Sequence, residues 1–415
     1  MSKRDPTHEP SSIVQPSTAR FLPYGRQTIE ADDIAAISEA MSGDYLTTGP
    51  AVQRFEAAFK AATGAAHAGV CNSGTAALHL AMMALDIGPG DAVVVPSLTF
   101  LATANCVRYC GGEVIFADVD PDTGLLEARH VEAALERSGR ARVRAINVVH
   151  LNGQCVDMEA IAAIARPRGI FIVEDACHAL GATHRSGDAQ VKVGACAHSE
   201  LACFSLHPVK AMTTGEGGIV TTNDARLAER VERLRSHGMT RDPKVMANRT
   251  LAFDADGQPN PWYYEMPEPG YNYRLPDILC VLGQRQLGKL ERFIDKRRML
   301  AAEYDRLIGQ LAPLMRRVPV ALHSTHAYHL YPLLIDFERV RHSRAATMAK
   351  LRERGIGTQV HYIPVHQQPY YRKRYGALAL AGADAYYARC LSLPVFPTME
   401  RSDVDRVVSA LAELV

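Results

Sequence analysis

Two residues of this chain have types and positions typical of covalent catalysis. Asp175 ends an apolar run, IFIVED at 170–175. A carboxylate there loses hydration, and the free-energy cost of that loss is offset only by a positive partner. Lys210 lies in the segment FSLHPVKAMTTGEGG at 204–218, just before a threonine pair and a glycine-rich turn. A desolvated lysine amine becomes a nucleophile for carbonyl groups. Each residue alone also has an ordinary explanation, since Lys210 could be a solvated surface lysine and Asp175 a helix-capping aspartate. The neighbouring motifs must decide between these roles and a catalytic one.

Other candidate residues follow other apolar runs. Ser73, Gly74 and Thr75 follow the run at 68–71 and open a helical pattern, where amides and the helix dipole favour a phosphate, although simple N-capping explains them too. Phe100 follows the run at 92–96 and is either a core aromatic or a ring that stacks on a flat ligand. His178 comes three residues after Asp175 and is either structural or functional.

Together these residues match the needs of pyridoxal 5'-phosphate (PLP) chemistry. PLP requires a lysine for the Schiff base, a carboxylate at the pyridine nitrogen, an anion site for the phosphate and a flat group over the ring. Lys210, Asp175, 73–75 and Phe100 supply these in turn. An opposite charge shifts a pKa by about 1–3 units and so keeps the ring nitrogen protonated. The sequence therefore predicts a PLP enzyme that passes through the pyridoxamine (PMP) form.

The candidate residues lie in a region where short runs of β-branched residues, typical of strands, alternate with runs of amphipathic helical pattern. This alternation favours a mostly parallel sheet covered by helices, with ligands at the carboxyl ends of the strands. The last two runs follow one another without a helix, which predicts one antiparallel member. The seven expected strands are 68–71, 92–96, 113–119, 144–150, 170–175, 201–205 and 218–222, and the expected helices between them are 75–85, 101–111, 129–138 and 158–169.

The pattern changes near residue 282, which predicts a second, smaller α/β domain. A long amphipathic helix over 282–311 is followed by an apolar strand at 328–337, a helix at 343–355, a strand at 356–364 and a closing helix at 402–414. We expect a large domain over 21–280, a small domain over 281–415 and a disordered extension over 1–20. The Pro-, Gly- and Tyr-rich stretch 238–272 is expected to be a long functional loop.

The composition narrows the class of protein. The chain of 415 residues is 47% hydrophobic and 22% charged with a net charge of +1, which argues against nucleic acid or membrane partners. Its nine scattered cysteines, without a CxxC pair, favour a reducing compartment and predict no metal site. No apolar leader or long apolar run is visible, so we expect a cytoplasmic protein. No GxGxxG follows the first strand, which disfavours a nicotinamide oxidoreductase.

Four motifs resemble the DegT/DnrJ/EryC1/StrS family of nucleotide-sugar aminotransferases. They are NSGTAAL, EDACHALGA, FSLHPVKAMTTGEGG and GYNYRLPDI, and the resemblance runs from about Leu22 to Val415. It implies fold type I, the architecture of aspartate aminotransferase, with a mostly parallel seven-stranded sheet in the large domain. It also implies a homodimer with a shared active site. The implied roles are a Schiff-base lysine and proton shuttle at Lys210, a pyridinium partner at Asp175, a ring neighbour at His178 and a ring cover at Phe100. Phosphate contacts are implied from Ser73, Gly74, Thr75 and Ser205, and from Asn272 of a second subunit.

Within that family, the segments LPYGRQTIEADDI, YLTTGPAVQRFE, PWYYEMPEPGYNYRL and VHYIPVHQQPYY resemble the transaminases of pseudaminic acid biosynthesis. This implies amination at C4 of a UDP-linked 4-keto-6-deoxy-N-acetylhexose by L-glutamate. The implied products are UDP-4-amino-4,6-dideoxy-N-acetyl-β-L-altrosamine and 2-oxoglutarate. The residues implied to line the sugar-nucleotide groove are Tyr45, Thr47, His329, His361 and His366.

The sequence departs from the family pattern at some positions, and alternatives for the substrate and for the function stay open. The segment HLNGQCVDM at 150–158 stands where relatives usually read closer to HFAGQPCDM, and Cys177 replaces a common Ser or Ala. The first departure bears on the substrate pocket, so another UDP- or dTDP-linked keto sugar is an alternative substrate. A PMP-dependent sugar dehydratase has histidine in place of the lysine, and Lys210 argues against it. A non-enzymatic regulator with this fold is a further alternative, against which the intact Lys–Asp pair argues.

Overall fold

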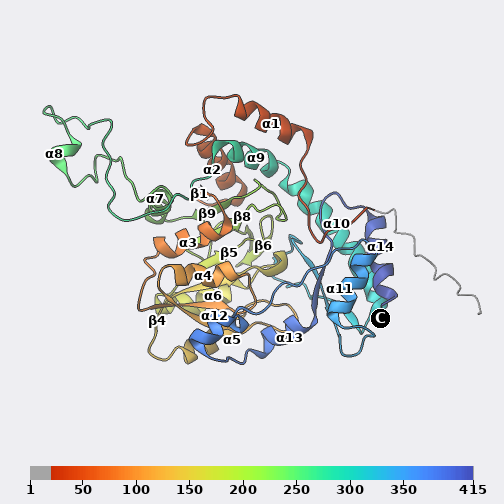
Figure 1. Cartoon of the computed structure of the whole chain (residues 1–415). Coiled ribbons are helices and arrows are strands. Elements are labelled where there is room, and N and C mark those ends of the chain that lie inside the picture. The colour runs from red at the N-terminus through yellow and green to blue at the C-terminus, as the bar shows by residue number, and fades with distance from the viewer. Residues whose placement is uncertain (1–19, 415) are drawn as a thin grey trace, which may run out of the picture.

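All seven strands expected in the large domain lie in one sheet of the computed structural model, which describes residues 20–414 (Figure 1). The spatial order is β1-β9-β8-β5-β4-β2-β3, and β9 runs antiparallel to both β1 and β8 while the other neighbours are parallel. The prediction of one antiparallel member in a mostly parallel sheet is confirmed. The strands are β1 (His67–Cys71), β2 (Asp91–Pro96), β3 (Glu113–Ala117), β4 (Arg142–Val149), β5 (Phe171–Asp175), β8 (Leu201–Ser205) and β9 (Gly218–Thr222).

The helices between these strands form where the sequence pattern places them. Strand β2, between β4 and the edge strand β3, is buried along its whole length, as its run of valines predicts for a strand covered on both faces. The helices pack against the sheet through alanine, leucine and valine side chains that belong to one continuous core. They are α3 (Gly74–Ala84), α4 (Leu101–Tyr109), α5 (Ala128–Arg137), α6 (Met158–Ala165) and α7 (Ala225–Leu234), while α1 (Ala31–Met41), α2 (Pro50–Thr63) and α9 (Asp277–Leu287) pack together beside them.

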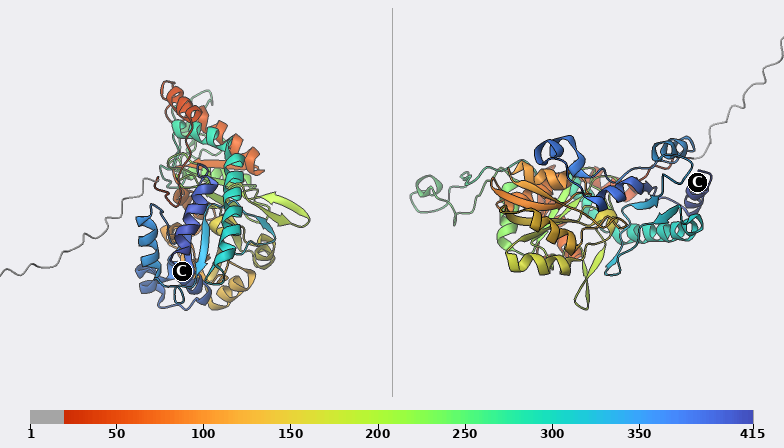
Figure 2. Two further views of the ribbon diagram at one scale, coloured as in Figure 1. Left: turned by 90° about the vertical axis from the view of Figure 1, so that its right-hand side faces the viewer. Right: turned by 90° about the horizontal axis from the view of Figure 1, so that it is seen from below.

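A second core surrounds a three-stranded antiparallel sheet near the C-terminus. Its strands β10 (Met315–Arg317), β12 (Tyr331–Ile335) and β13 (Cys390–Leu393) pack against α10 (Leu290–Ile308), α11 (Arg344–Glu353) and α14 (Arg401–Ala412). Helices α10 and α14 pack against each other and lie side by side in the left view of Figure 2. Leu22 joins this core from the other end of the chain, because its backbone pairs with Gly355 and Gly357. The predicted extension over 1–20 lies outside the described residues except for Arg20.

The predicted helix over 282–311 is interrupted, so that expectation was wrong in its length. Helix α9 ends at Leu287, Gly288 and Lys289 form a break, and α10 begins at Leu290. The Lys289 ammonium lies 2.6 Å from the Asp32 carboxylate and 2.9 Å from that of Asp33, both in α1. These ion pairs hold the lysine against α1.

The predicted strand over 356–364 is absent from the structure. Only isolated bridges form there, between Ile356 and Leu22 and between Gln359 and Ser392. The alternating pattern that suggested a strand has another cause, because Val360 and Tyr362 pack against the large core while His361 bonds to Ser392 of β13. This segment therefore connects the two cores beside the sheet edge where ligands are expected.

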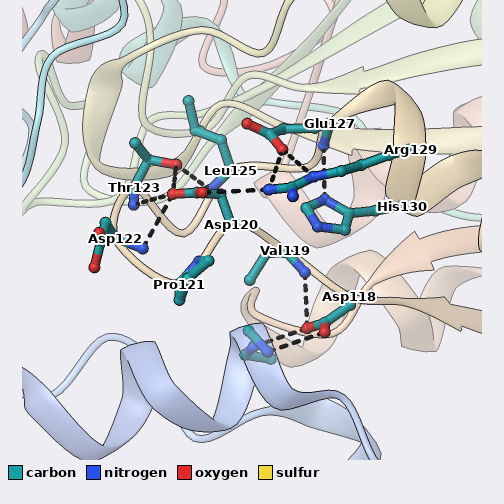
Figure 3. Close-up of polar contacts among 12 residues, drawn as sticks. Asp118, Val119, Asp120, Pro121, Asp122, Thr123, Leu125, Glu127, Arg129 and His130 are labelled. Atoms are coloured by element: carbon teal, nitrogen blue, oxygen red, sulfur yellow. Dashed lines mark hydrogen bonds and ion pairs between the residues drawn. The ribbon is translucent and has the colours of Figure 1, made fainter.

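The turn after β3 also ties the two parts of the chain together (Figure 3). The Asp118 carboxylate accepts hydrogen bonds from the backbone amides of Gly382 and Ala383, in the first turn of α13 (Ala381–Arg389). The Asp120 carboxylate accepts from the amides of Asp122 and Thr123 within the turn itself. These bonds anchor α13, and α12 (Pro369–Tyr375) lies against the same sheet through Tyr371 and Phe116.

Two features project from this body. A hairpin of β6 (Thr183–Ser186) and β7 (Ala189–Lys192), joined by β11 (Ser324–Thr325), was not expected from the sequence and projects in Figure 2. The stretch 238–272 extends away from α7 as an arm that contains only the short helix α8 (Arg249–Ala252) (Figure 1). Short 3₁₀ helices lie at Leu151–Gly153, Arg166–Arg168, Gly309–Leu311 and Val365–Gln367.

Candidate active site

A cavity of about 630 Å³ lies at the carboxyl ends of β4, β5 and β8. This volume falls in the range of roughly 300–1,000 Å³ that is typical of small-molecule sites. The starts of α3 and α4 and the segment 359–363 complete its wall. The predicted site residues that line it are Ser73, Gly74, Thr75, Phe100, Asp175, His178, Ser205, Lys210 and His361. The structure thus brings together side chains that are up to 288 positions apart, from 73 to 361, in one cleft.

Asp175 is buried at the end of β5 and is held by two protein donors. Its Oδ2 accepts a 2.6 Å hydrogen bond from the Thr103 hydroxyl, and its Oδ1 accepts a 3.2 Å bond from the backbone amide of Cys177. Ionised carboxylates accept such bonds at several lone pairs, so Asp175 keeps capacity for a further donor from the cavity. The carboxylate is fixed in direction by these two contacts.

Lys210 reaches the cavity from the turn that follows β8. Its backbone amide donates to the His207 carbonyl at 2.9 Å, and its Nζ lies 3.5 Å from Nε2 of His329. Burial lowers the pKa of the Lys210 amine, and the nearby Cys177 and Asp175 oppose that shift. A lowered pKa increases the fraction of neutral amine at a given pH, which is the form that attacks a carbonyl.

His178 is held in one tautomer by contacts on both ring nitrogens. The backbone amide of Asn152 donates to its Nδ1 at 3.3 Å, so Nε2 carries the proton and faces the Tyr362 hydroxyl at 3.0 Å. Burial and the Lys210 charge hold the pKa of His178 well below its usual range, and the same holds for His329, whose ring lies 4.3 Å away. Both imidazoles are therefore neutral near pH 7.

The start of α3 forms a narrow cradle against the end of β8. Ser73 caps the helix, since its hydroxyl accepts from the Ala76 amide at 3.0 Å. A Cβ atom at Gly74 would lie 2.7 Å from the Cβ of Ser205, and one at Gly218 would lie 2.1 Å from the Ser73 carbonyl oxygen. The glycines therefore permit a close approach of the helix N-terminus to Ser205, which suits an anion.

Aromatic side chains stand at the mouth of the cavity. Phe100 precedes α4, is 54% exposed and lies 6.0 Å from the ring of Tyr362. The pKa of the Tyr362 phenol is raised well above its usual value, chiefly by burial, so the hydroxyl stays protonated. Phe100 offers a ring face at the entrance, as expected for a residue that covers a flat ligand.

Five other predicted residues do not line this cavity within one chain, and one of them, His329, contacts the Lys210 amine as described above. Tyr45 and Thr47 are exposed on the segment between α1 and α2, and Tyr45 borders a separate pocket beside α9. Asn272 is exposed, and its carbonyl accepts a 3.4 Å bond from the Asn72 side chain. His366 is buried, and its Nδ1 lies 2.5 Å from the Ser97 hydroxyl.

Sequence reasoning did not single out Thr99, Thr103, Asn152 and Tyr362. Thr99 and Tyr362 line the cavity, while Thr103 and Asn152 contact Asp175 and His178 directly. Thr103 lies in the helical run that follows Phe100, where a hydroxyl among apolar residues was a usable signal. The contact between Tyr362 and His178 spans 184 positions, so no local pattern could indicate it.

Two classes of feature are absent from the part of the chain that the structure describes. No group of three or more His, Cys, Asp or Glu side chains in residues 20–414 is placed to hold a metal ion. Among the helices in the same residues, none combines the length and apolar character needed to span a membrane.

Comparison with known proteins identifies the family. The sequence pattern of the DegT/DnrJ/EryC1/StrS aminotransferase family matches residues 27–412. The spore coat polysaccharide biosynthesis protein SpsC of Bacillus subtilis is 38% identical over 398 residues, which are 95% of this chain and 97% of SpsC.

Solved structures agree over a similar length. Helicobacter pylori PseC, an aminotransferase involved in the biosynthesis of pseudaminic acid, superposes with a TM-score of 0.83 at 28% identity and covers 95% of this chain and 99% of its own. DesV of S. venezuelae superposes with a TM-score of 0.80 at 31% identity, over 95% and 98% of the two chains. The chain belongs to the DegT/DnrJ/EryC1/StrS aminotransferase family, and it is an aminotransferase that depends on PLP.

Proposed function

We propose that this protein is a nucleotide-sugar aminotransferase that uses Lys210 and Asp175 as its two central catalytic residues. The observation that carries the proposal is that the Lys210 amine and the Asp175 carboxylate line one cavity at the carboxyl ends of the strands. The similarity to SpsC and PseC, whose names place them in polysaccharide and pseudaminic acid biosynthesis, supports a sugar substrate.

The residues around the cavity fit PLP. Asp175 offers an oriented carboxylate for the pyridine nitrogen, and Phe100 offers a ring face beside it. The close approach of Gly74 to Ser205 forms a cradle for the phosphate at a helix N-terminus. His178 would lie beside the ring, held there by Asn152 and Tyr362.

When bound, PLP supplies an aldehyde carbon that carries the amino group and a ring that accepts electrons. The Lys210 amine would hold the cofactor at that carbon and, when free, would take up and release a proton at its Nζ beside the reacting atoms. Its lowered pKa favours the neutral base for this task. Asp175 would hold a proton on the ring nitrogen, and the neutral His178 and His329 add no positive charge beside the amine.

The specific reaction that we propose is amination at C4 of a UDP-linked 4-keto-6-deoxy-N-acetylhexose. L-Glutamate gives up its amino group and leaves as 2-oxoglutarate, and the sugar becomes UDP-4-amino-4,6-dideoxy-N-acetyl-β-L-altrosamine. The cavity wall from the segment 359–363, with His361 at its centre and His329 behind Lys210, is where the sugar would lie. Another UDP- or dTDP-linked keto sugar is the alternative substrate.

We further propose a homodimer in which the partner completes the site. Exposed aromatic residues gather beside Asn272: Tyr271 is 44% exposed and Tyr109 is 54% exposed, and both rings contact His79. Tyr45, itself 58% exposed, lies on another open surface. In such a dimer, Asn272 of one subunit would meet the phosphate cradle of the other, and Tyr45 and Thr47 would line its sugar groove. A cytoplasmic location remains a prediction from cysteine usage.

The test is a panel of UDP- and dTDP-linked 4-keto sugars incubated with L-glutamate and read by mass spectrometry. We expect the amine product from the UDP-linked N-acetyl-4-keto-6-deoxy sugar, and none from a Lys210→Ala control. Product only from dTDP-linked sugars would contradict the proposed substrate. The absence of any amine product across the panel would contradict the proposed nucleotide-sugar activity.

A further inference from the structure

Behind Asp175, two threonine hydroxyls form a short hydrogen-bonded chain that ends at the cavity wall. The Thr103 hydroxyl lies 2.6 Å from Asp175 Oδ2, and the Thr99 hydroxyl lies 2.7 Å from the Thr103 hydroxyl. Thr99 lines the cavity, whereas Thr103 is fully buried on the first turn of α4.

The direction of the protons along this chain follows from hydrogen-bond chemistry. An ionised carboxylate only accepts, so Thr103 must donate its single hydroxyl proton to Asp175. The Thr103 oxygen is then left as an acceptor, so the Thr99 hydroxyl donates to it. Both bonds therefore point toward the carboxylate, and each donor polarises the next.

The backbone around Thr103 fixes this arrangement. The Thr103 amide donates to the Phe100 carbonyl at 3.2 Å, and the Thr103 carbonyl accepts from the buried Asn147 side chain of β4 at 3.1 Å. These bonds tie the Thr103 backbone to α4 and β4, and the short side chain then places the hydroxyl against Asp175.

A proton would lie between the Asp175 carboxylate and the ring nitrogen of the cofactor. We propose that Thr103, supported by Thr99, is a positioning residue that keeps this proton on the ring nitrogen. This inference rests on the proposed role of Asp175 at the pyridine nitrogen. A hydroxyl that donates to a carboxylate stabilises its charged form and lowers its attraction for a proton. With that donor in place, the proton between Asp175 and the ring stays on the ring. Without it, the carboxylate draws the proton to itself and leaves a neutral ring, which accepts electrons poorly.

The experiment compares wild type with Thr103→Val, which keeps the shape and removes the hydroxyl, and Thr103→Ser, which keeps the hydroxyl. Each apoprotein is loaded with PLP labelled with ¹⁵N in the ring, and the ¹⁵N chemical shift reports whether the ring nitrogen is protonated. We expect a protonated nitrogen in wild type and Thr103→Ser, and a shift toward the neutral position in Thr103→Val. We also expect kcat to fall about tenfold or more, as for the loss of one hydrogen bond to a charged group.

Thr347→Val is the matched control. Thr347 is also a buried helical threonine, its hydroxyl donates to the carbonyl of Ser343 at the N-cap of α11, and no residue of α11 lines the cavity. The Thr347→Val variant should lower thermal stability about as much as Thr103→Val while leaving the ¹⁵N shift and kcat unchanged. A purely structural role for Thr103 would produce the same outcome as this control.

An unchanged ¹⁵N shift in Thr103→Val, or a neutral ring in Thr103→Ser, would overturn the inference. Should Thr103→Val fail to fold, Thr99→Val carries the test, with a smaller shift expected in the same direction and no shift contradicting the role. If wild type itself binds no PLP or shows a neutral ring nitrogen, the proposed role of Asp175 fails instead, so the two failures are distinguishable.

Discussion

At the scale of single residues, Lys210 and Asp175 are unlike most lysines and aspartates because both are withdrawn from bulk water in the same cavity. Burial lowers the pKa of the Lys210 amine, while two protein donors fix the Asp175 carboxylate. The burial of these two side chains does not serve stability, since an uncompensated buried charge is destabilising. The pair therefore makes physical sense when a ligand lies between them.

Asp175→Asn tests the carboxylate. The amide still fits the space and accepts from Thr103, but it carries no charge to hold a proton on the ring nitrogen. We expect the rate of amino transfer to fall by about ten- to thousandfold, from a loss of about 1–3 pKa units at the ring nitrogen.

Cofactor retention separates this effect from misfolding. Because the phosphate cradle at Ser73–Thr75 is untouched, equilibrium dialysis should still find PLP bound to Asp175→Asn. Single-turnover rates equal to wild type would remove the argument for a protonated ring.

At the scale of elements, the site depends on how closely α3 and β8 approach each other. Gly74→Ala would place a methyl group 2.7 Å from the Cβ of Ser205, so one element must move. Such overpacking costs about 1–3 kcal/mol, and it should also weaken PLP binding by disturbing the cradle. Denaturant unfolding and PLP titration of the apoprotein measure both effects.

Gly88→Ala is the matched control, because a Cβ there has nothing within 4 Å and its backbone lies outside the positive-φ region. Its unfolding free energy should stay within about 0.5 kcal/mol of wild type. Equal PLP affinity in Gly74→Ala and wild type would show that the cradle does not hold the phosphate.

The segment that leads into β12 should make stability depend on pH. His326 is buried, its Nδ1 accepts from the Tyr328 amide, and burial lowers its pKa to about 3. Because the unfolded chain keeps the ordinary value near 6.5, it binds more protons than the folded chain between these limits. This contribution is therefore present above pH 6.5 and is lost as the pH falls toward 3, by at most about 1.4 kcal/mol per pH unit.

His326→Gln isolates that contribution. Denaturant unfolding at pH 7.5 and pH 5.5 should show a smaller loss of stability in the variant than in wild type. An identical loss in both proteins would mean that His326 does not titrate as its burial implies.

The elements also show how far sequence reasoning reaches. The seven strands and their alternating helices were predicted because β-branched runs and helical periodicity are local signals. The predicted site residues that follow β1, β2, β5 and β8 lie in one cavity. The break at Gly288 and the missing strand at 356–364 depend on contacts with α1 and with both cores, which no local pattern encodes. Tyr362 was missed for the same reason, since its contact with His178 spans 184 positions, whereas Thr103 carried a local signal that was not used.

At the scale of the whole molecule, one chain leaves Asn272, Tyr45 and Thr47 outside the cavity that they were expected to serve. The arm over 238–272 likewise exposes Trp262, which is 72% accessible and is the only tryptophan in the chain. These surfaces are accounted for if a second copy of the chain completes each site.

We therefore expect light scattering to give the mass of a dimer, and we expect Asn272→Ala to lose PLP more readily on dialysis without a change in that mass. Asn260→Ala, on the same arm, serves as the control, because its side chain bonds only locally to the Leu251 carbonyl. A fully active monomer would refute the shared site.

The central claim is that the amine of Lys210, among all lysines of the chain, bonds to the cofactor. The most direct measurement is to load the protein with PLP, reduce it with borohydride and locate the added pyridoxyl group by peptide mass spectrometry. The account predicts that the group lies on Lys210 and that Lys210→Ala carries none. A pyridoxyl group on another lysine of the wild-type protein, or none at all, would contradict it.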